Sequence, residues 1–127
     1  MIFDKAQVLR FKPAEANAKE LAERLHRIKS FFAQRTRVTK YLRRGLFLEA
    51  WASYHRCVLQ PLVELLRLRY RPSSADYWLV HASDHLPPTV RTEVEGLFQV
   101  SSLAEFPEKM ERADKLFRET LAEIERE

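Results

Sequence analysis

The stretch from Leu46 to Tyr70, LFLEAWASYHRCVLQPLVELLRLRY, decides the fold. Its polar residues follow one another at steps of three or four, so on a helix they form one narrow stripe. Together with the residue just beyond Tyr70, they are Glu49, Ser53, Arg56, Gln60, Glu64, Arg67 and Arg71. Almost every other residue is apolar. We therefore expect a central helix over residues 46–70, surrounded by other helices on most sides and with Trp51 buried.

Pro61 lies in the middle of this predicted helix. A proline inside a helix lacks the N–H for one backbone hydrogen bond, and its ring crowds the carbonyl four residues earlier, here that of Cys57. We expect the helix to bend at Pro61, and the bend to present Glu64 beside a pocket.

The rest of the chain is also typical of helices. Only two of its 127 residues are glycine, which argues against hairpins and glycine-rich phosphate loops. Helical spacing and proline, glycine and serine positions predict four more helices: 13–44 with a break near Thr36 and a stop at Gly45, 76–84 with Ser74 as a possible cap, 88–98, and a last helix capped by Ser101 or Ser102 and ending near Glu125. The predicted fold is an all-α, up-and-down bundle of about five helices.

Residues 1–12 differ from the remainder. Ile2-Phe3 and Val8-Leu9 flank polar residues, a pattern that favours a short extended segment needing a neighbour to pair with. We therefore divide the chain into this segment and a helical domain over 13–127. The apolar residues near the N-terminus also suggest a possible homo-oligomer.

Charge is unevenly distributed although the net charge is only +4. Basic residues dominate between Arg24 and Arg71, and acidic residues dominate after Leu103. Two interpretations stay open, namely internal pairing of the two regions or an anionic partner on the basic one. Cys57 is the only cysteine and no long uncharged apolar stretch occurs, so we expect a cytoplasmic protein without disulfides or membrane contact.

Glu64 is the most interesting carboxylate. With Arg67 three residues later it forms either an exposed ion pair or a hydroxyl-binding general base in a cleft, kept ionised by Arg67. His55 is either a packed histidine or a polar contact in the same cleft. His81 and His85 have a metal-compatible spacing but no evident third ligand, so we expect no metal site.

The order of four motifs, YLRRG, EAWASYHR, PLVELLRLRYRP and DYWLVHASDHLPP, resembles the helical C-terminal domain of nucleotidyltransferases related to the aminoglycoside adenylyltransferases. The resemblance covers nearly the whole chain. It implies that residues 1–12 are the seam to a catalytic domain absent from this chain, with its Gly-Ser turn and metal-binding carboxylates. Mg²⁺ and ATP would bind only through that domain, so this chain holds no cofactor of its own.

The resemblance also implies an acceptor-binding cleft on the helical domain. Glu64 matches the carboxylate that activates the acceptor hydroxyl in some members, and Glu49 is the second choice. The expected acceptor-binding residues are Ser53, His55, Arg56, Gln60, Arg67 and Arg71. These arginines suit an anionic acceptor better than a cationic aminoglycoside.

The sequence therefore predicts a helical substrate-binding domain of a nucleotidyltransferase, inactive alone, whose partners are a fused or separate catalytic domain and a small-molecule acceptor. Two alternatives stay open. One is a stand-alone interaction partner of a separate minimal nucleotidyltransferase. The other, less favoured, is a nucleic-acid-binding bundle, suggested by the basic neighbours of Tyr41 and Tyr70.

Overall fold

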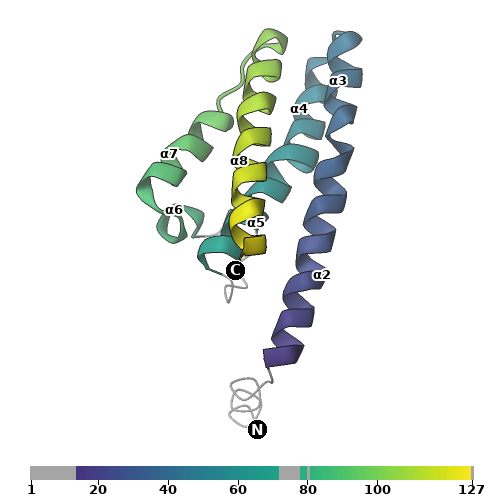
Figure 1. Cartoon of the computed structure of the whole chain (residues 1–127). Helices are drawn as coiled ribbons and strands as arrows, with labels where there is room; N and C mark the ends of the chain where they lie inside the picture. Colours follow the sequence, from purple (N-terminus) through teal and green to yellow (C-terminus); the bar gives the residue numbers. More distant parts are fainter. Residues whose placement is uncertain (1–13, 72–77, 80, 127) are drawn as a thin grey trace, which may run out of the picture.

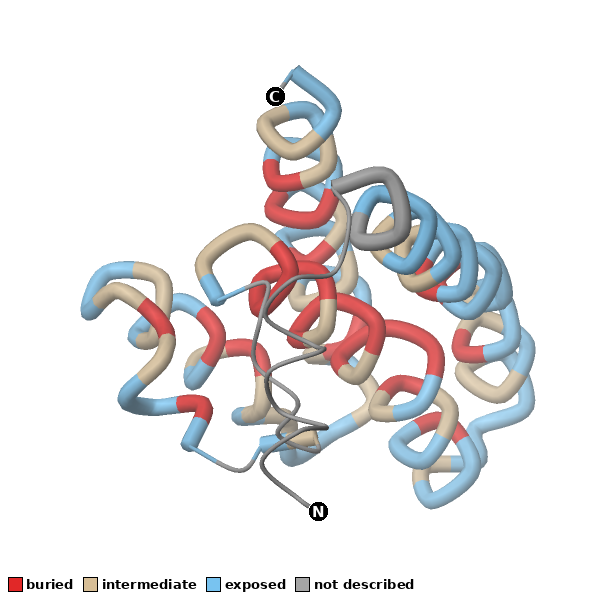
Figure 2. Tube along the Cα trace, turned by 90° about the horizontal axis from the view of Figure 1, so that it is seen from below, coloured by how far each residue is buried: buried red, intermediate tan, exposed pale blue. Residues whose placement is uncertain are grey.

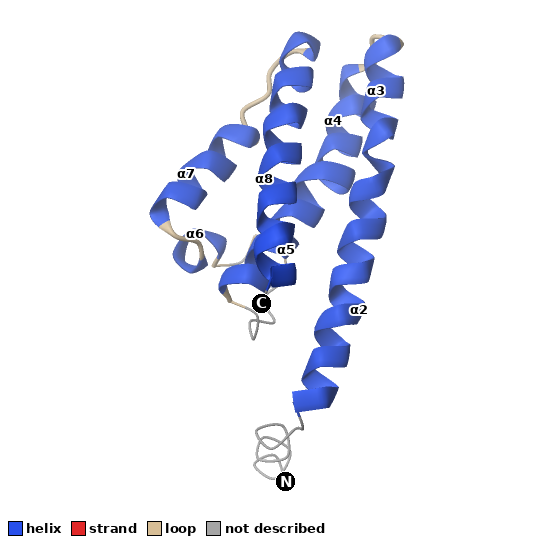
Figure 3. Cartoon of the chain, in the orientation of Figure 1, coloured by secondary structure: helices blue, strands red, loops and turns tan. Residues whose placement is uncertain are grey.

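The computed structural model describes residues 14–71, 78–79 and 81–126, and these residues are mostly helical. The elements, labelled as in Figure 1, are α2 (Ala14–Phe32), the 3₁₀ turn η1 (Ala33–Arg35), α3 (Thr36–Arg43), α4 (Phe47–Tyr54), the π-helical turn η2 (His55–Leu59), α5 (Gln60–Tyr70), α6 (Ala82–His85), α7 (Pro88–Leu97), the 3₁₀ turn η3 (Leu103–Glu105) and α8 (Phe106–Arg126). Figure 3 shows no strand in the described part, which confirms the all-α class. The extended segment expected over 1–12 lies outside the described residues.

A sharp turn at Gly45 follows the first helices, α2 and α3. The predicted break near Thr36 is confirmed, because η1 separates α2 from α3. After α3, the N–H of Gly45 donates to the carbonyl of Leu42 at 3.1 Å and that of Leu46 to the carbonyl of Tyr41 at 3.0 Å. This is the Schellman pattern, which needs a residue with positive φ. Gly45 supplies it at φ +71° and lets α4 return alongside α3.

The central helix continues past Pro61, but with a π-helical turn immediately before the proline. Within this turn the N–H of Gln60 donates to the carbonyl of His55, five residues back. Such turns are rare and often lie at functional sites. The irregularity that we expected at Pro61 is thus a widened turn. The extra residue rotates the side chains of α5 relative to those of α4.

The core lies around α5, which packs between α2 and α8. Leu59, Leu62, Leu65 and Leu66 are fully buried, and Figure 2 shows the buried residues gathered in the middle of the bundle. The rings of Phe32 and Phe117 stack with their centroids 3.7 Å apart, joining α2 to α8. The prediction of a surrounded central helix is therefore right for its second half.

The prediction is wrong for α4. Trp51 is 40% exposed and Leu48 is 79% exposed, because only one side of α4 faces the bundle. Ala50 and Tyr54 occupy that side and are buried. This apolar helix was expected to be surrounded on most sides, yet it lies at the edge of the bundle.

The prediction of a helix over residues 76–84 is also wrong. Trp78 and Leu79 lie in a turn, and the only helix described there is α6, Ala82–His85. Trp78 and His81 have positive φ of 54° and 59°, which no helix through these residues would allow. Ser74, its possible cap, lies outside the described residues. The next helix, α7, begins at Pro88 as predicted.

A carboxylate holds the segment that leads into the last helix. Glu105 accepts hydrogen bonds from the backbone N–H and hydroxyl of Ser101, both at 3.0 Å, and from the hydroxyl of Ser102 at 3.3 Å. The two serines were expected to accept at the helix start, but their hydroxyls donate to Glu105 instead. These hydrogen bonds lower the pKa of Glu105.

The acidic C-terminal helix pairs with the basic helices. Lys29 contacts Glu125 at 2.9 Å, Arg35 contacts Asp114 at 3.2 Å and Arg69 contacts Glu123 at 3.6 Å. Internal pairing thus accounts for part of the charge asymmetry. No helix within the described ranges is long and apolar enough to cross a membrane.

Candidate functional site

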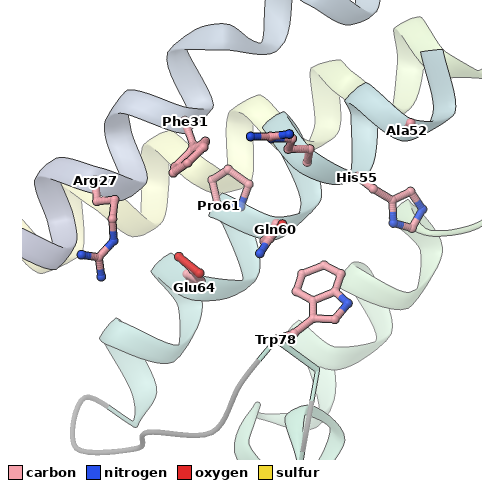
Figure 4. A pocket seen from close by; sticks show the side chains of 9 residues that line it. Arg27, Phe31, Ala52, His55, Gln60, Pro61, Glu64 and Trp78 are labelled. Atoms are coloured by element: carbon pink, nitrogen blue, oxygen red, sulfur yellow. The ribbon is translucent and has the colours of Figure 1, made fainter. Parts of the chain in front are cut away.

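A pocket of about 490 Å³ lies beside the π-helical turn. Figure 4 shows side chains from α2, from the central helix and from the Trp78 turn converging on it. The described residues that line it are Arg27, Phe31, Ala52, His55, Arg56, Gln60, Pro61, Glu64 and Trp78. The pocket therefore combines two aromatic rings, an imidazole, an amide, a carboxylate and two guanidinium groups.

Glu64 is the only carboxylate among these lining residues and is half-buried. Burial raises the pKa of its carboxyl group, and the positive charges of Arg27 and Arg24 on α2 partly offset this effect. A carboxylate in such surroundings accepts a proton more readily than one in water. It can also accept a hydrogen bond from a hydroxyl group that enters the pocket.

His55 begins the π-helical turn and lies between aromatic rings. Its imidazole contacts the indole of Trp51 in a tilted arrangement with centroids 3.7 Å apart, and it meets the ring of Phe98 edge-on at 5.5 Å. Burial lowers the pKa of His55, so the ring is neutral at pH 7 and offers one donor and one acceptor. His55 is packed against aromatic rings and also lines the pocket, and its role as a polar contact for an acceptor stays a prediction.

Trp78 is one of the lining residues that sequence reasoning missed. We had placed it in a helix, whereas its left-handed backbone directs it to the pocket wall. Its indole packs against Phe98 with centroids 6.2 Å apart. The motif DYWLVHASDHLPP contains Trp78, but nothing in the sequence showed that Trp78 would lie beside the central helix. Phe31 and Arg27 were missed for the same reason, since they come from α2.

Arg67 lies in a different place from the one expected. Its side chain is buried, with 3% of the residue exposed. The Nε donates to the carbonyl of Trp78 at 3.1 Å, and Nη1 lies 3.0 Å from Nδ1 of His85. The Trp78 turn and α6 lie against this side of α5 and bury Arg67. Arg67 supports the wall of the pocket from behind rather than lining it.

The other predicted site residues divide into two groups. Arg56 and Gln60 line the pocket with Glu64 and His55. Glu49 and Arg71 are exposed and Ser53 is half-buried, and none of the three is among the described lining residues.

A metal centre has no evident place in the described part of the chain. No group of three or more histidine, cysteine, aspartate or glutamate side chains there could hold an ion. The rings of His81 and His85 lie 5.8 Å apart, and His85 faces Arg67.

Comparisons with protein-family models, with curated proteins and with solved structures found no match to this chain. The chemistry of the pocket must therefore be argued from its own residues. Its carboxylate, amide and neutral imidazole can bind hydroxyl and amino groups, and its guanidinium groups can bind an anion.

Proposed function

We propose that this chain is the helical substrate-binding domain of a nucleotidyltransferase, and that the pocket at the π-helical turn receives a small-molecule acceptor. The single observation that carries the proposal is the half-buried Glu64 carboxylate at the floor of the pocket. In this role Glu64 accepts a hydrogen bond from the acceptor hydroxyl and takes its proton as the oxygen bonds to the α-phosphorus of ATP. The bond from that phosphorus to the pyrophosphate oxygen breaks, and pyrophosphate leaves. The raised pKa suits a group that must accept a proton near neutral pH.

The nucleotide and Mg²⁺ belong to a catalytic domain in this proposal, either fused to the chain or on a separate protein. The chain contributes the acceptor pocket, and it orients the hydroxyl group toward the catalytic domain. Such positioning is a large part of catalysis in phosphoryl and nucleotidyl transfer, because the reacting groups must be held in line.

The first experiment is a transfer assay with labelled ATP and Mg²⁺, using a metabolite extract as the source of acceptors. The purified chain alone should label nothing. The chain combined with the nucleotidyltransferase catalytic domain from its own gene or a neighbouring gene should label an acceptor. Transfer by the chain alone, or the absence of any such catalytic domain from the gene and its neighbours, would contradict the proposal.

The apolar surface of α4 favours the alternative in which the catalytic domain is a separate protein. Leu46, Leu48 and Trp51 are exposed on this edge helix, and a partner that covered them would bury apolar surface on binding. Co-purification of the two proteins, weakened by Leu48→Asp, would support the two-chain arrangement. A single polypeptide that contains both domains would exclude it.

A further inference from the structure

The pocket's lining identifies the chemical class of its ligand more narrowly than a hydroxyl-bearing acceptor. We infer that the pocket binds a flat heteroaromatic ring that carries an anionic group, the chemistry of a nucleoside monophosphate. This inference rests on the proposed function of the pocket as an acceptor site, but it concerns binding and can be tested without transfer.

Two aromatic rings from different elements indicate the flat ring. Phe31 comes from α2 and Trp78 from the turn after α5, and Figure 4 shows them on opposite sides of Gln60. Phe31 is 36% exposed, so its ring is available for contact. Aromatic side chains bind planar rings by stacking, largely independently of which base the ring is.

Hydrogen-bonding groups line the pocket together with these two rings. Gln60 is half-buried and its amide offers both a donor and an acceptor, while the Glu64 carboxylate offers acceptors. A heteroaromatic ring presents donors and acceptors along its edge, and a hydrocarbon ring does not. The polar floor therefore favours a heteroaromatic ligand over a purely apolar one.

The charge of the lining indicates the anionic group. Arg27 and Arg56 contribute two positive charges, Glu64 contributes one negative charge and His55 is neutral. The net charge of the lining side chains is therefore +1. Among the described residues, neither Arg27 nor Arg56 makes an ion pair of 4.0 Å or shorter. Guanidinium groups bind phosphate and carboxylate strongly. The same two charges repel a polycationic ligand.

The test is isothermal titration of the full chain at low ionic strength with the ribonucleoside 5′-monophosphates as probes. Two partial probes separate the contributions, namely adenosine, which has the ring without the anion, and ribose 5-phosphate, which has the anion without the ring. The monophosphates should bind with one site per chain, and each partial probe should bind about tenfold more weakly or worse.

Variants assign the binding to this pocket. Trp78→Leu and Phe31→Leu should each weaken monophosphate binding about five- to tenfold while leaving ribose 5-phosphate unchanged. Phe31→Leu keeps the test valid if Trp78→Leu does not fold. Arg27→Gln should weaken monophosphate binding about fivefold and reduce its dependence on salt. Arg43→Gln, an exposed arginine of α3 outside the pocket lining, is the matched control and should bind normally.

Two results would overturn the inference. One is the absence of saturable binding by any of the monophosphates at millimolar concentration. The other is monophosphate binding that equals ribose 5-phosphate binding and is unaffected by both aromatic substitutions. Failure here is distinguishable from failure of the proposed function. If transfer requires Glu64 while no monophosphate binds, only the ligand class is wrong. If monophosphates bind in the pocket while Glu64→Gln leaves transfer unchanged, only the proposed function is wrong.

Discussion

The buried guanidinium of Arg67 donates a hydrogen bond of 3.1 Å from Nε to the backbone carbonyl of Trp78. This bond ties the turn that forms one wall of the pocket to the central helix. The same guanidinium lies 3.0 Å from the imidazole of His85, so one side chain connects α5, the turn and α6. The pocket wall therefore depends on a residue that does not itself line the pocket.

Substitution of Arg67 should loosen the attachment of the Trp78 turn to the central helix. Arg67→Met leaves the Trp78 carbonyl without its charged donor, and we expect a loss of about 1.5–3 kcal/mol in unfolding free energy. In a Trp51→Phe background the fluorescence comes from Trp78 alone, because the chain has two tryptophans, and its emission should shift to the red as the indole meets water. Arg71→Met, on an exposed residue at the end of the same helix, should leave both measurements unchanged. Unchanged emission in Arg67→Met would show that the bond does not position Trp78.

The hydroxyl of Tyr54 should contribute measurably to stability. It is fully buried and donates to the carbonyl of Leu97 at 2.6 Å, which connects α4 to the end of α7. Tyr54→Phe removes the donor and leaves the carbonyl unpaired, so we expect a loss of about 1–2 kcal/mol in chemical denaturation. Tyr41→Phe, at a half-buried position, serves as the control. Equal stability of Tyr54→Phe and the natural chain would mean that water replaces the lost donor.

The exposure of Trp51 predicts an unusually mild effect for a tryptophan substitution. Trp51→Ala removes a ring that is 40% exposed and contacts His55, so the loss should stay near 1 kcal/mol. Phe106→Ala removes a fully buried ring and should cost about 3–5 kcal/mol. Similar melting temperatures for the two variants would contradict the placement of α4 at the edge of the bundle.

Glu64 should make stability depend on pH in a defined direction. Burial raises the pKa of its carboxyl group in the folded state. Its favourable contribution is therefore complete below the unfolded pKa, about 4.3, and is lost as the pH rises through the folded pKa. Glu64→Gln should thus be at least as stable as the natural chain at pH 7.5 and lose that advantage at pH 4. Denaturation of both proteins at the two pH values measures this, with Glu49→Gln as the exposed control. The opposite result, in which Glu64→Gln is less stable than the natural chain at pH 7.5 but not at pH 4, would contradict the predicted direction.

The sequence predicted most of the helices because their signals are local. The spacing of apolar residues, the break near Thr36, the positive φ at Gly45 and the proline at the start of α7 depend only on neighbouring residues. The site was predicted in part for the same reason. His55, Arg56, Gln60 and Glu64 lie within ten residues of one another around the disturbed turn.

What the sequence did not predict depends on contacts between distant segments. Phe31 and Arg27 reach the pocket because α2 packs against α5, and Trp78 reaches it because Arg67 holds its turn. Arg67 is in the interior because the Trp78 turn and α6 lie against it, contacts between distant segments that the helical pattern does not contain. Trp51 was misplaced because the composition of a helix does not show which of its sides have neighbours.

We propose that the Glu64 carboxylate serves an acceptor in this pocket. The most direct measurement is kcat/KM for nucleotide transfer by the chain joined to, or mixed with, its catalytic domain, compared between Glu64→Gln and Glu49→Gln. We predict a fall of about 10²–10⁴-fold for Glu64→Gln, the range expected when a general base is lost, and near-normal transfer for Glu49→Gln. Full activity in Glu64→Gln together with loss in Glu49→Gln would move the role to the other end of the helix. Full activity in both would contradict a catalytic role for either carboxylate.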